Sequence, residues 1–309
     1  MDFKVAWRLM SDSVWHEGEL EVQRRAGVAY EAGELQGMIR PGMAPPVAIF
    51  LAQRQFAVLG SIDAKGRPWA SVVVGEPNFI RALDPFTVEI SGGWAESDPL
   101  LANILHDPQL GMLAIDFNNR RRVRINGTAQ RTDGILRIHA EQVFSNCPKY
   151  IQARIPGELS ATAAATPLIA TKLAQKQQEW ISRADTFFIA SAHPQHGVDA
   201  SHRGGNPGFV HVESESRLLI PDYSGNNLFN TLGNIQLNPR AGLLFVDFES
   251  GTTLQLTGRA TINWDESARV GFAGAQRLLE FDIEEVRETQ HGAPLRFDFR
   301  TYSPFNPAL

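Results

Sequence analysis

From residue 47 onward, the hydrophobic pattern predicts short β-strands. Runs rich in β-branched and aromatic residues are bounded by turn residues, as in FAVLGSI (56–62), PWASVVVG (68–75) and FTVEISGG (86–93). Strands do not alternate with long helices, so the pattern favours antiparallel sheets over a parallel α/β fold. We expect a mainly β fold with helical inserts, built from small barrels, because barrel closure removes exposed strand edges.

The remaining segments carry helix and turn signals. WHEGELEVQRRAG (15–27) predicts a helix closed by Gly27, and prolines punctuate the end of a helical and irregular lead-in, residues 1–46. We also expect a short helix at 99–105, a turn into a helix within 134–152, and a helix at 265–279. We expect the proline-punctuated C-terminal tail to lie over the surface and not to form an independent element.

An internal repeat divides the chain. LGMLAIDF (110–117) matches AGLLFVDF (241–248), and the same offset of 131 residues pairs Gly127 with Gly258. The sequence therefore predicts a first barrel at 47–155 and a second barrel with the tail at 180–309, joined by a linker and helix at 156–179. We expect the copies to pack as a pseudo-dimer with a binding groove at their junction.

Composition narrows the class of protein. The chain has 309 residues, 43% hydrophobic and 20% charged, which is typical of a globular protein with two domains. A net charge of −5 disfavours a nucleic-acid partner, and the single Cys147 excludes an internal disulfide. No signal-like or membrane-length apolar run occurs, so we expect a cytoplasmic protein without a membrane partner.

The segment from Asp199 to Asn234 reads as a seat for an anion. Arg203 supplies a fixed positive charge, and glycines allow close approach of the backbone. After Pro221 a polar loop leads into a helix start, whose free N–H groups would face the loop's ligand. The alternative is a β-turn followed by a capped helix that binds nothing.

The two copies differ at this seat. The offset places Val72 opposite Arg203 and the acidic Glu96 and Asp98 opposite Asn227 and Phe229. At about 5 Å and an effective dielectric of about 20, the interaction energy between two unit charges is about 3 kcal/mol, so carboxylates at this position would repel an anionic ligand. We therefore expect that the first copy has lost its site. The arginines at 120–122 and 124 could reach the ligand across the junction, but a solvated rim is the favoured reading.

Several long motifs resemble one known family. HRGGNPGFV (202–210), LLIPDYSGNNLFNTLGN (218–234) and FSNCPKYIQ (144–152) resemble the two-copy branch of the pyridoxamine 5'-phosphate oxidase-related flavin-nucleotide-binding proteins. The resemblance implies tandem split β-barrels and non-covalent FMN. It implies a phosphate near Arg203, Asn226 and Asn227, and an isoalloxazine lying on the backbone of Gly208 and Phe209.

The cofactor-binding residues that we expect, from the seat and from the resemblance together, belong mostly to the second copy. They are Arg203, Gly204, Gly205, Gly208, Phe209, Asp222, Tyr223, Asn226, Asn227, Phe229, Thr231 and Asn234, with Lys149 from the first copy. A cation at Lys149 near the flavin N1–C2 edge would stabilise the reduced anion. Neighbouring Cys147 could lie over the flavin with Lys149 and Tyr150, but a small core residue is the favoured reading.

Two departures from the family pattern limit the functional prediction. Asn226 and Asn227 stand where the oxidase has an Arg-Lys pair, and the tail 294–309 lacks the oxidase's Trp- and Arg-containing substrate motif. Oxidation of pyridoxamine phosphate is therefore not implied. No metal is expected either, because His193, His196 and His202 lack supporting ligands and Leu20 stands four residues after His16.

The resemblance implies, as the leading hypothesis, an FMN-dependent oxidoreductase that passes electrons from a reduced donor to a small acceptor. The donor would be a nicotinamide nucleotide or a separate reductase, since no dinucleotide-binding fingerprint occurs in the sequence. The alternatives are a flavin carrier or sensor without turnover, and a barrel that has lost its cofactor and acts as an interaction module. Whether two such chains associate into a homodimer of pseudo-dimers is a further alternative that the sequence leaves open.

Overall fold

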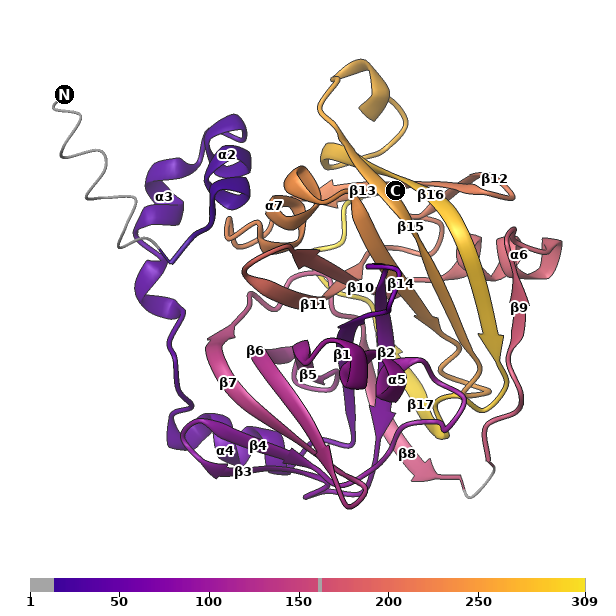
Figure 1. Cartoon of the computed structure of the whole chain (residues 1–309). Coiled ribbons are helices and arrows are strands. Elements are labelled where there is room, and N and C mark those ends of the chain that lie inside the picture. Colours follow the sequence, from indigo (N-terminus) through magenta and orange to yellow (C-terminus); the bar gives the residue numbers. More distant parts are fainter. Residues whose placement is uncertain (1–13, 161–162, 309) are drawn as a thin grey trace, which may run out of the picture.

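The computed structural model describes residues 14–160 and 163–308 and contains two large antiparallel sheets (Figure 1). The first copy comprises β1 (Phe56–Ile62), β2 (Pro68–Val74), β3 (Ile80–Asp84), β4 (Thr87–Ile90), α5 (Leu100–His106), β5 (Gln109–Asp116), β6 (Arg121–Thr132) and β7 (Ile135–Ser145). The second comprises β10 (Thr186–His193), β11 (Gly197–Gly204), β12 (His211–Ser214), β13 (Arg217–Tyr223), α7 (Asn230–Leu237), β14 (Arg240–Val246), β15 (Thr253–Asn263) and β16 (Ala275–Thr289).

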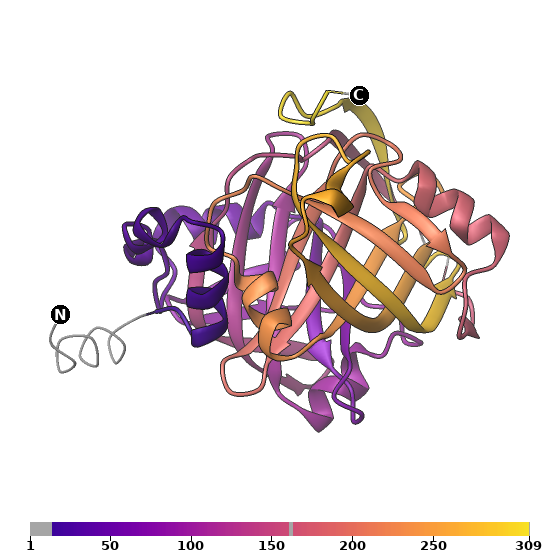
Figure 2. The ribbon, with the colours of Figure 1, turned by 90° about the horizontal axis from the view of Figure 1, so that it is seen from above.

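The strand order confirms the repeat. The first sheet runs β2-β1-β5-β6-β7-β4-β3 and the second runs β11-β10-β14-β15-β16-β13-β12, which is the same order copy for copy. Seen from above, the two copies stand side by side (Figure 2). The copies differ most in length at one hairpin: residues 133–134 join β6 to β7, whereas 264–274, with η2 (Ser267–Arg269), join β15 to β16. The prediction of a mainly β fold in two copies is confirmed.

A hydrophobic cluster at the junction holds the copies together as a pseudo-dimer. It contains Phe56 and Phe117 of the first copy with Phe188 and Phe248 of the second. Phe117 and its repeat equivalent Phe248 lie edge-to-face, with ring centroids 5.4 Å apart. Each copy also has its own core. The junction is therefore a third core, and it fixes how residues from both copies meet.

Two equivalent glycines let the sheets approach closely. A Cβ on Gly111 would lie 2.5 Å from the Val198 carbonyl oxygen, and one on Gly242 would lie 2.4 Å from that of Pro68. Real Cβ atoms do not come so near to backbone oxygens, so glycine is required at both positions. The repeat thus preserves the residue that permits backbone contact across the junction.

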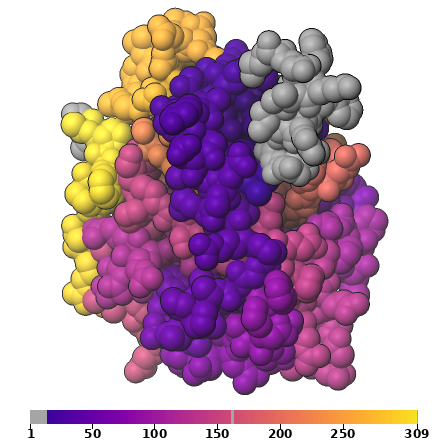
Figure 3. Space-filling model, turned by 90° about the vertical axis from the view of Figure 1, so that its left-hand side faces the viewer, coloured from indigo at the N-terminus to yellow at the C-terminus, as the bar shows by residue number. Residues whose placement is uncertain are grey.

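The N-terminal segment lies across both copies. It contains α2 (Glu17–Arg25), α3 (Ala29–Gly33), η1 (Gln36–Met38) and α4 (Pro45–Ala52). Helix α2 packs against α7 of the second copy, and α4 packs against β3 of the first. Figure 3 shows the segment in indigo running down one face of the molecule. The predicted helix at 15–27 is confirmed, while residues 1–13 of the lead-in lie outside the described residues.

The segments outside the repeat complete the fold. These are β8 (Ala153–Leu159), β9 (Leu168–Ala170), α6 (Gln175–Arg183) and β17 (Leu295–Thr301). Strand β17 pairs with β8, and the tail after it returns to Gln152, whose side chain accepts a hydrogen bond from the Ser303 N–H (2.7 Å). Among the described residues, no helix is both long enough and apolar enough to cross a bilayer.

Two helix predictions are wrong. Residues 275–289 form β16, which pairs with β13 and β15 on its two edges, and these ladders override a local helical pattern. Positive φ angles at Gly271 (91°) and Gly274 (75°) also interrupt any helix there. The segment after β7 contains no helix, because Tyr150 has a φ of 66° that a right-handed helix excludes.

Candidate functional site

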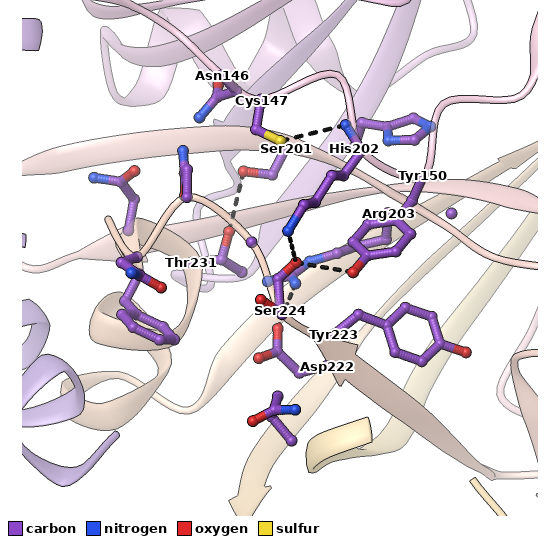
Figure 4. A pocket seen from close by; sticks show the side chains of 18 of the residues that line it. Asn146, Cys147, Tyr150, Ser201, His202, Arg203, Asp222, Tyr223, Ser224 and Thr231 are labelled. Atoms are coloured by element: carbon purple, nitrogen blue, oxygen red, sulfur yellow. Dashed lines mark hydrogen bonds and ion pairs between the residues drawn. The ribbon is translucent and has the colours of Figure 1, made fainter. Parts of the chain in front are cut away.

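A pocket lies at the junction, where the end of β13 and the start of α7 in the second copy face β6 and residues 146–150 of the first (Figure 4). It brings together most of the predicted cofactor residues: Lys149, Arg203, Gly204, Phe209, Asp222, Tyr223, Asn226, Asn227, Phe229 and Thr231. Residues as far apart along the chain as Ala26 and Arg277 thus share one cavity, which both copies build.

Three predicted residues lie outside this pocket. Gly205 packs beside Phe209, where a Cβ would come within 2.6 Å of the ring. Gly208 lines a neighbouring cavity. Asn234 is buried behind the pocket, and its Nδ2 donates to Asp199 Oδ2 (2.7 Å) and Ser191 Oγ (3.1 Å). Roles for these three residues in cofactor binding stay predictions.

Arg203 and Arg277 share one carboxylate at the second-copy side of the pocket. Asp222 accepts a hydrogen bond from Arg203 (2.5 Å), and its other oxygen lies 3.3 Å from Arg277 Nε. The Arg277 guanidinium also lies over the rings of Phe229 and Trp264, each at 4.9 Å. Burial lowers the pKa of Arg277, and the neighbouring Arg203 lowers it further. The single carboxylate of Asp222 therefore neutralises only one of these two cations.

Arg122 and Arg124 line the pocket from the first copy, so the solvated-rim reading is wrong for both. Arg124 donates to Asn230 Oδ1 (3.2 Å) and is paired with Asp199. The spacing of the two arginines could have revealed this in the sequence, because residues two apart on a strand face the same side of the sheet. Arg121, one residue before Arg122, is exposed, and its guanidinium lies over the Phe50 ring instead.

Arg122 is held without a carboxylate. In the part of the chain that the structure describes, its hydrogen bonds go to His202 Nδ1 (3.0 Å) and the Cys147 carbonyl oxygen (2.8 Å), and its Nε is buried without a partner. Burial, with Arg124 and Arg203 nearby, lowers its pKa to about 10. A cation in this position favours an anionic ligand, because an opposite charge offsets its desolvation.

His202 is a neutral part of the same wall. Because its Nδ1 accepts from Arg122, its proton resides on Nε2. Burial and the charges of Arg122, Arg154 and Arg203 hold its pKa well below the ordinary value of 6.5. From the sequence His202 was weighed only as a metal ligand and not as part of this wall, although it precedes Arg203 directly.

Positive charge dominates the pocket. The charged side chains that line it are Arg122, Arg124, Lys149, Arg203 and Arg277, with Asp222 opposing them. Even with Asp199 behind Arg124, cations outnumber carboxylates. At an effective dielectric of about 20, unit opposite charges about 4 Å apart attract by about 4 kcal/mol. The electrostatics therefore suit a ligand that carries more than one negative charge.

A clasp from the first copy crosses the edge of the pocket. Tyr150 Oη and Lys149 Nζ both donate to the Ser224 carbonyl oxygen, at 2.8 and 3.5 Å (Figure 4). The Tyr150 and Tyr223 rings lie 5.2 Å apart. We call Lys149, Tyr150 and Ser224 the clasp. It ties the first copy to the loop that precedes α7.

The corresponding position in the first copy is filled by side chains from both copies. Asp98, the equivalent of Phe229, accepts hydrogen bonds from Ser71 Oγ (2.5 Å) and from Gln255 Nε2 (3.0 Å). Gln255 is the equivalent of Arg124, so an amide stands where the second-copy pocket has a cation. Burial raises the pKa of Asp98. These contacts support the expectation that the first copy has lost its site.

A histidine cluster beside α2 brings together three groups that metals favour. The ligand atoms of His16, Glu17 and His193 lie within 4.8 Å of one another. However, His16 Nδ1 accepts the Gly18 N–H, and His193 Nδ1 accepts the N–H groups of residues 195 and 196. Each ring therefore carries its proton on Nε2 and has no lone pair left for a metal. The residues do not fit a metal ion.

Comparison with known proteins identifies both copies. The family model described as pyridoxamine 5'-phosphate oxidase matches residues 43–164 and 173–290. No curated protein matches the sequence.

Three solved structures that resemble the chain each cover 40% of it or less. HupZ from Group A Streptococcus is 15% identical, covering 40% of this chain and 98% of that one with a TM-score of 0.33. A putative pyridoxamine 5'-phosphate oxidase from Lactobacillus delbrueckii is 17% identical, covering 38% and 94% with a TM-score of 0.32. An FAD-binding protein from Mesorhizobium loti is 12% identical, covering 40% and 98% with a TM-score of 0.28.

Proposed function

The chain belongs to the pyridoxamine 5'-phosphate oxidase family, as two tandem copies of its split β-barrel, and from this premise we propose that it is an FMN-dependent oxidoreductase. In this proposal one FMN binds at the junction pocket and mediates electron transfer from a reduced donor to a small acceptor. The first copy contributes pocket residues but holds no flavin of its own.

The observation that carries the proposal is Arg122, a cation with a buried Nε and no carboxylate among its described partners. Arg124, Arg203 and Arg277 surround the same space. A phosphate monoester carries up to two negative charges, and guanidinium groups bind it well because their N–H groups match its oxygens. The residues present therefore fit a flavin mononucleotide.

The loop before α7 adds neutral donors for the phosphate. Asn226 and Asn227 replace the basic pair of the oxidase, and positive φ angles of 60° at Asn227 and Phe229 turn the backbone toward α7. The first N–H groups of a helix have no partner within the helix, and they favour anions. In this proposal the positive charge comes from the arginines around the pocket, and the loop supplies hydrogen bonds.

Bound FMN would supply the redox chemistry, which is the acceptance and release of a hydride or of two electrons. The residues of the chain orient it and set its electrostatics. Lys149 of the first copy would favour a negative charge on the ring and so the reduced state. His202 stays neutral at physiological pH and adds no charge to this wall.

The clasp gives weight to a second candidate function, a flavin carrier or sensor without turnover. Tyr150 and Lys149 line the pocket from the first copy, and both donate to the Ser224 carbonyl oxygen of the second copy. A nucleotide held behind such a clasp would exchange slowly, as a carrier or sensor requires. The oxidoreductase remains the first proposal, because the excess of cations also favours flavin reduction.

Identification of the ligand tests the proposal. The purified protein is denatured, and the released small molecules are identified by mass spectrometry and absorbance. Release of FMN in about one equivalent per chain supports the proposal, whereas release of no flavin, together with failure to bind added FMN, contradicts it. Anaerobic addition of NADH or NADPH then separates the two functions, since a flavin that neither nucleotide bleaches, even with an added flavin reductase, indicates a carrier or sensor.

A further inference from the structure

A second cavity of about 520 Å³ lies beside the junction pocket and shares Phe209 and Tyr223 with it. Its walls are the turn at 206–209, strands β12 and β13, residues 271–273 of the loop before β16, and residues 307–308 of the tail. The volume lies in the range of sites for small ligands, about 300–1,000 Å³. We call it the tail cavity.

The walls of the tail cavity carry no aspartate, glutamate, lysine or arginine among the described residues, in contrast to the five cations of the junction pocket. Aromatic side chains dominate, namely Phe209, Tyr223 and Phe272 with His211 beside them. Burial raises the pKa of Tyr223 to about 12, so this phenol is neutral at physiological pH. A charged ligand would lose hydration here without gaining a counter-charge.

The side chain of Asn206, a polar residue of the cavity wall, already makes hydrogen bonds to the tail. Its Nδ2 donates to the Pro307 carbonyl oxygen (2.8 Å), and its Oδ1 accepts from Asn306 Nδ2 (3.0 Å). It holds the tail in place as a wall, and it leaves few hydrogen bonds to offer to a ligand. The cavity therefore selects for apolar, flat surface that can pack against aromatic rings.

The walls belong to the second copy alone. Two residues, 133–134, occupy the hairpin that corresponds to 264–274, and the tail follows the repeat. Loop and tail are in contact, because a Cβ on Gly274 would lie 2.8 Å from Pro307 Cγ. Phe272 is also held edge-on to His211, with ring centroids 6.3 Å apart. The cavity is thus formed by two additions to the repeated barrel.

We propose that the tail cavity binds an uncharged aromatic small molecule, at a site separate from the anion-binding junction pocket. Phe209, Tyr223 and Phe272 supply the apolar contacts, and the absence of charged side chains from the described walls excludes ionic ligands. This site goes beyond the proposed flavin function and does not depend on the identity of the ligand in the junction pocket.

A charge-matched pair of probes tests the proposal by isothermal titration calorimetry on the full-length purified protein. 2-Naphthamide and 2-naphthoate share one ring system and differ in charge. We expect 2-naphthamide to bind and Phe272→Ala to weaken it about three- to tenfold, the equivalent of the 0.5–1.5 kcal/mol typical of an aromatic contact. Ala273→Asp, which adds a carboxylate to the wall, should weaken it more than tenfold.

Two controls separate the tail cavity from its surroundings. Val270→Asp adds the same charge on the same loop at a position that is 82% exposed, and it should leave 2-naphthamide binding unchanged. Arg203→Gln alters the junction pocket and should also leave it unchanged. Circular dichroism checks that each variant folds. If Ala273→Asp does not fold, Phe272→Ala alone tests the site.

Several results would overturn the proposal. One is that 2-naphthamide does not bind. Another is that 2-naphthoate binds as tightly as 2-naphthamide and that Ala273→Asp weakens its binding. Equal affinities in wild type and Phe272→Ala would also contradict it. Loss of FMN from Ala273→Asp as complete as that from Arg203→Gln would assign the cavity to the flavin site. Failure of the flavin proposal alone would leave the naphthamide result intact.

Discussion

Arg124 of the first copy donates a hydrogen bond to Asp199 of the second, and the two side chains are only 5% and 10% exposed. Asn126 and Asn234 donate to the same carboxylate, at 2.6 and 2.7 Å. This buried network crosses the junction and fixes one cation of the pocket wall. The pairing of the two copies and the shape of the site therefore depend on the same contacts.

The first prediction concerns this ion pair. Arg124→Met leaves Asp199 buried without its cation, so the free energy of unfolding should fall by about 3–5 kcal/mol. Chemical denaturation measures the change. Arg121→Met, an exposed arginine on the same strand, is the matched control and should change stability by less than about 0.5 kcal/mol. Equal effects of the two variants would contradict a structural role for the pair.

The second prediction concerns charge in the pocket. Arg203→Glu should abolish FMN retention, and Arg122→Gln should weaken it about a hundredfold, because a lost charge pair is worth about 3 kcal/mol at about 5 Å. Flavin content after gel filtration and titration with FMN measure this. Glu96→Lys, at the equivalent seat of the first copy, should retain FMN fully. Comparable loss in Arg203→Glu and Glu96→Lys would refute the asymmetry between the copies.

The third prediction concerns pH. Glu19 of α2 is buried and accepts hydrogen bonds from Asn230 Nδ2 (2.5 Å) and the His16 N–H (3.0 Å). Burial raises its pKa from 4.5 to about 8, and Asp199 adds to this. The folded protein therefore keeps the proton at a higher pH than the unfolded chain. The stability from this group is complete below about pH 4.5 and is lost as the pH rises through about 8.

Glu19→Gln removes this titration. Thermal unfolding between pH 5 and pH 9 should show the wild type losing stability relative to the variant as the pH rises, by a few kcal/mol in order of magnitude. Glu21→Gln, at a solvent-accessible position on the same helix, should follow the wild-type profile. Parallel profiles for wild type and Glu19→Gln would show that this carboxyl titrates normally.

The fourth prediction concerns the clasp. Tyr150→Phe removes the hydrogen bond to the Ser224 carbonyl oxygen, which is worth about 0.5–1.5 kcal/mol. Release of FMN into excess apoflavodoxin should accelerate about two- to tenfold. Tyr30→Phe, at a residue that is 79% exposed, controls for the substitution itself. Unchanged release would mean that the clasp does not retain the ligand.

The fifth prediction concerns the close approach of the copies. Gly242→Ala places a Cβ 2.4 Å from the Pro68 carbonyl oxygen, so the sheets must shift, at a cost of about 1–3 kcal/mol. Gly33→Ala, where a Cβ meets no atom within 4 Å, should be neutral or slightly stabilising. Denaturation midpoints of the two variants measure the difference. A tolerated Gly242→Ala would show that the junction can relax.

The strand pattern and the repeat made most of the fold predictable. Strand signals are local, and the constant offset from Asp116 to Asp247 and from Gly127 to Gly258 required two similar units. The helix prediction at 265–279 failed because pairing of β16 with two neighbouring strands outweighs local propensity. Gly271 and Gly274 were visible in the sequence, but their backbone angles were not.

The sequence by itself determined the two barrels and the second-copy half of the pocket, because Arg203, Asp222 and the loop at 224–229 are close along the chain or joined by one sheet. Only the tertiary structure decided that Arg122 and Arg124 complete the pocket, since they come from the other copy and their position depends on how the copies pack. The tail cavity likewise arises where loop and tail meet. Local chemistry can be read from residue order, whereas contacts across a junction depend on packing that no single segment specifies.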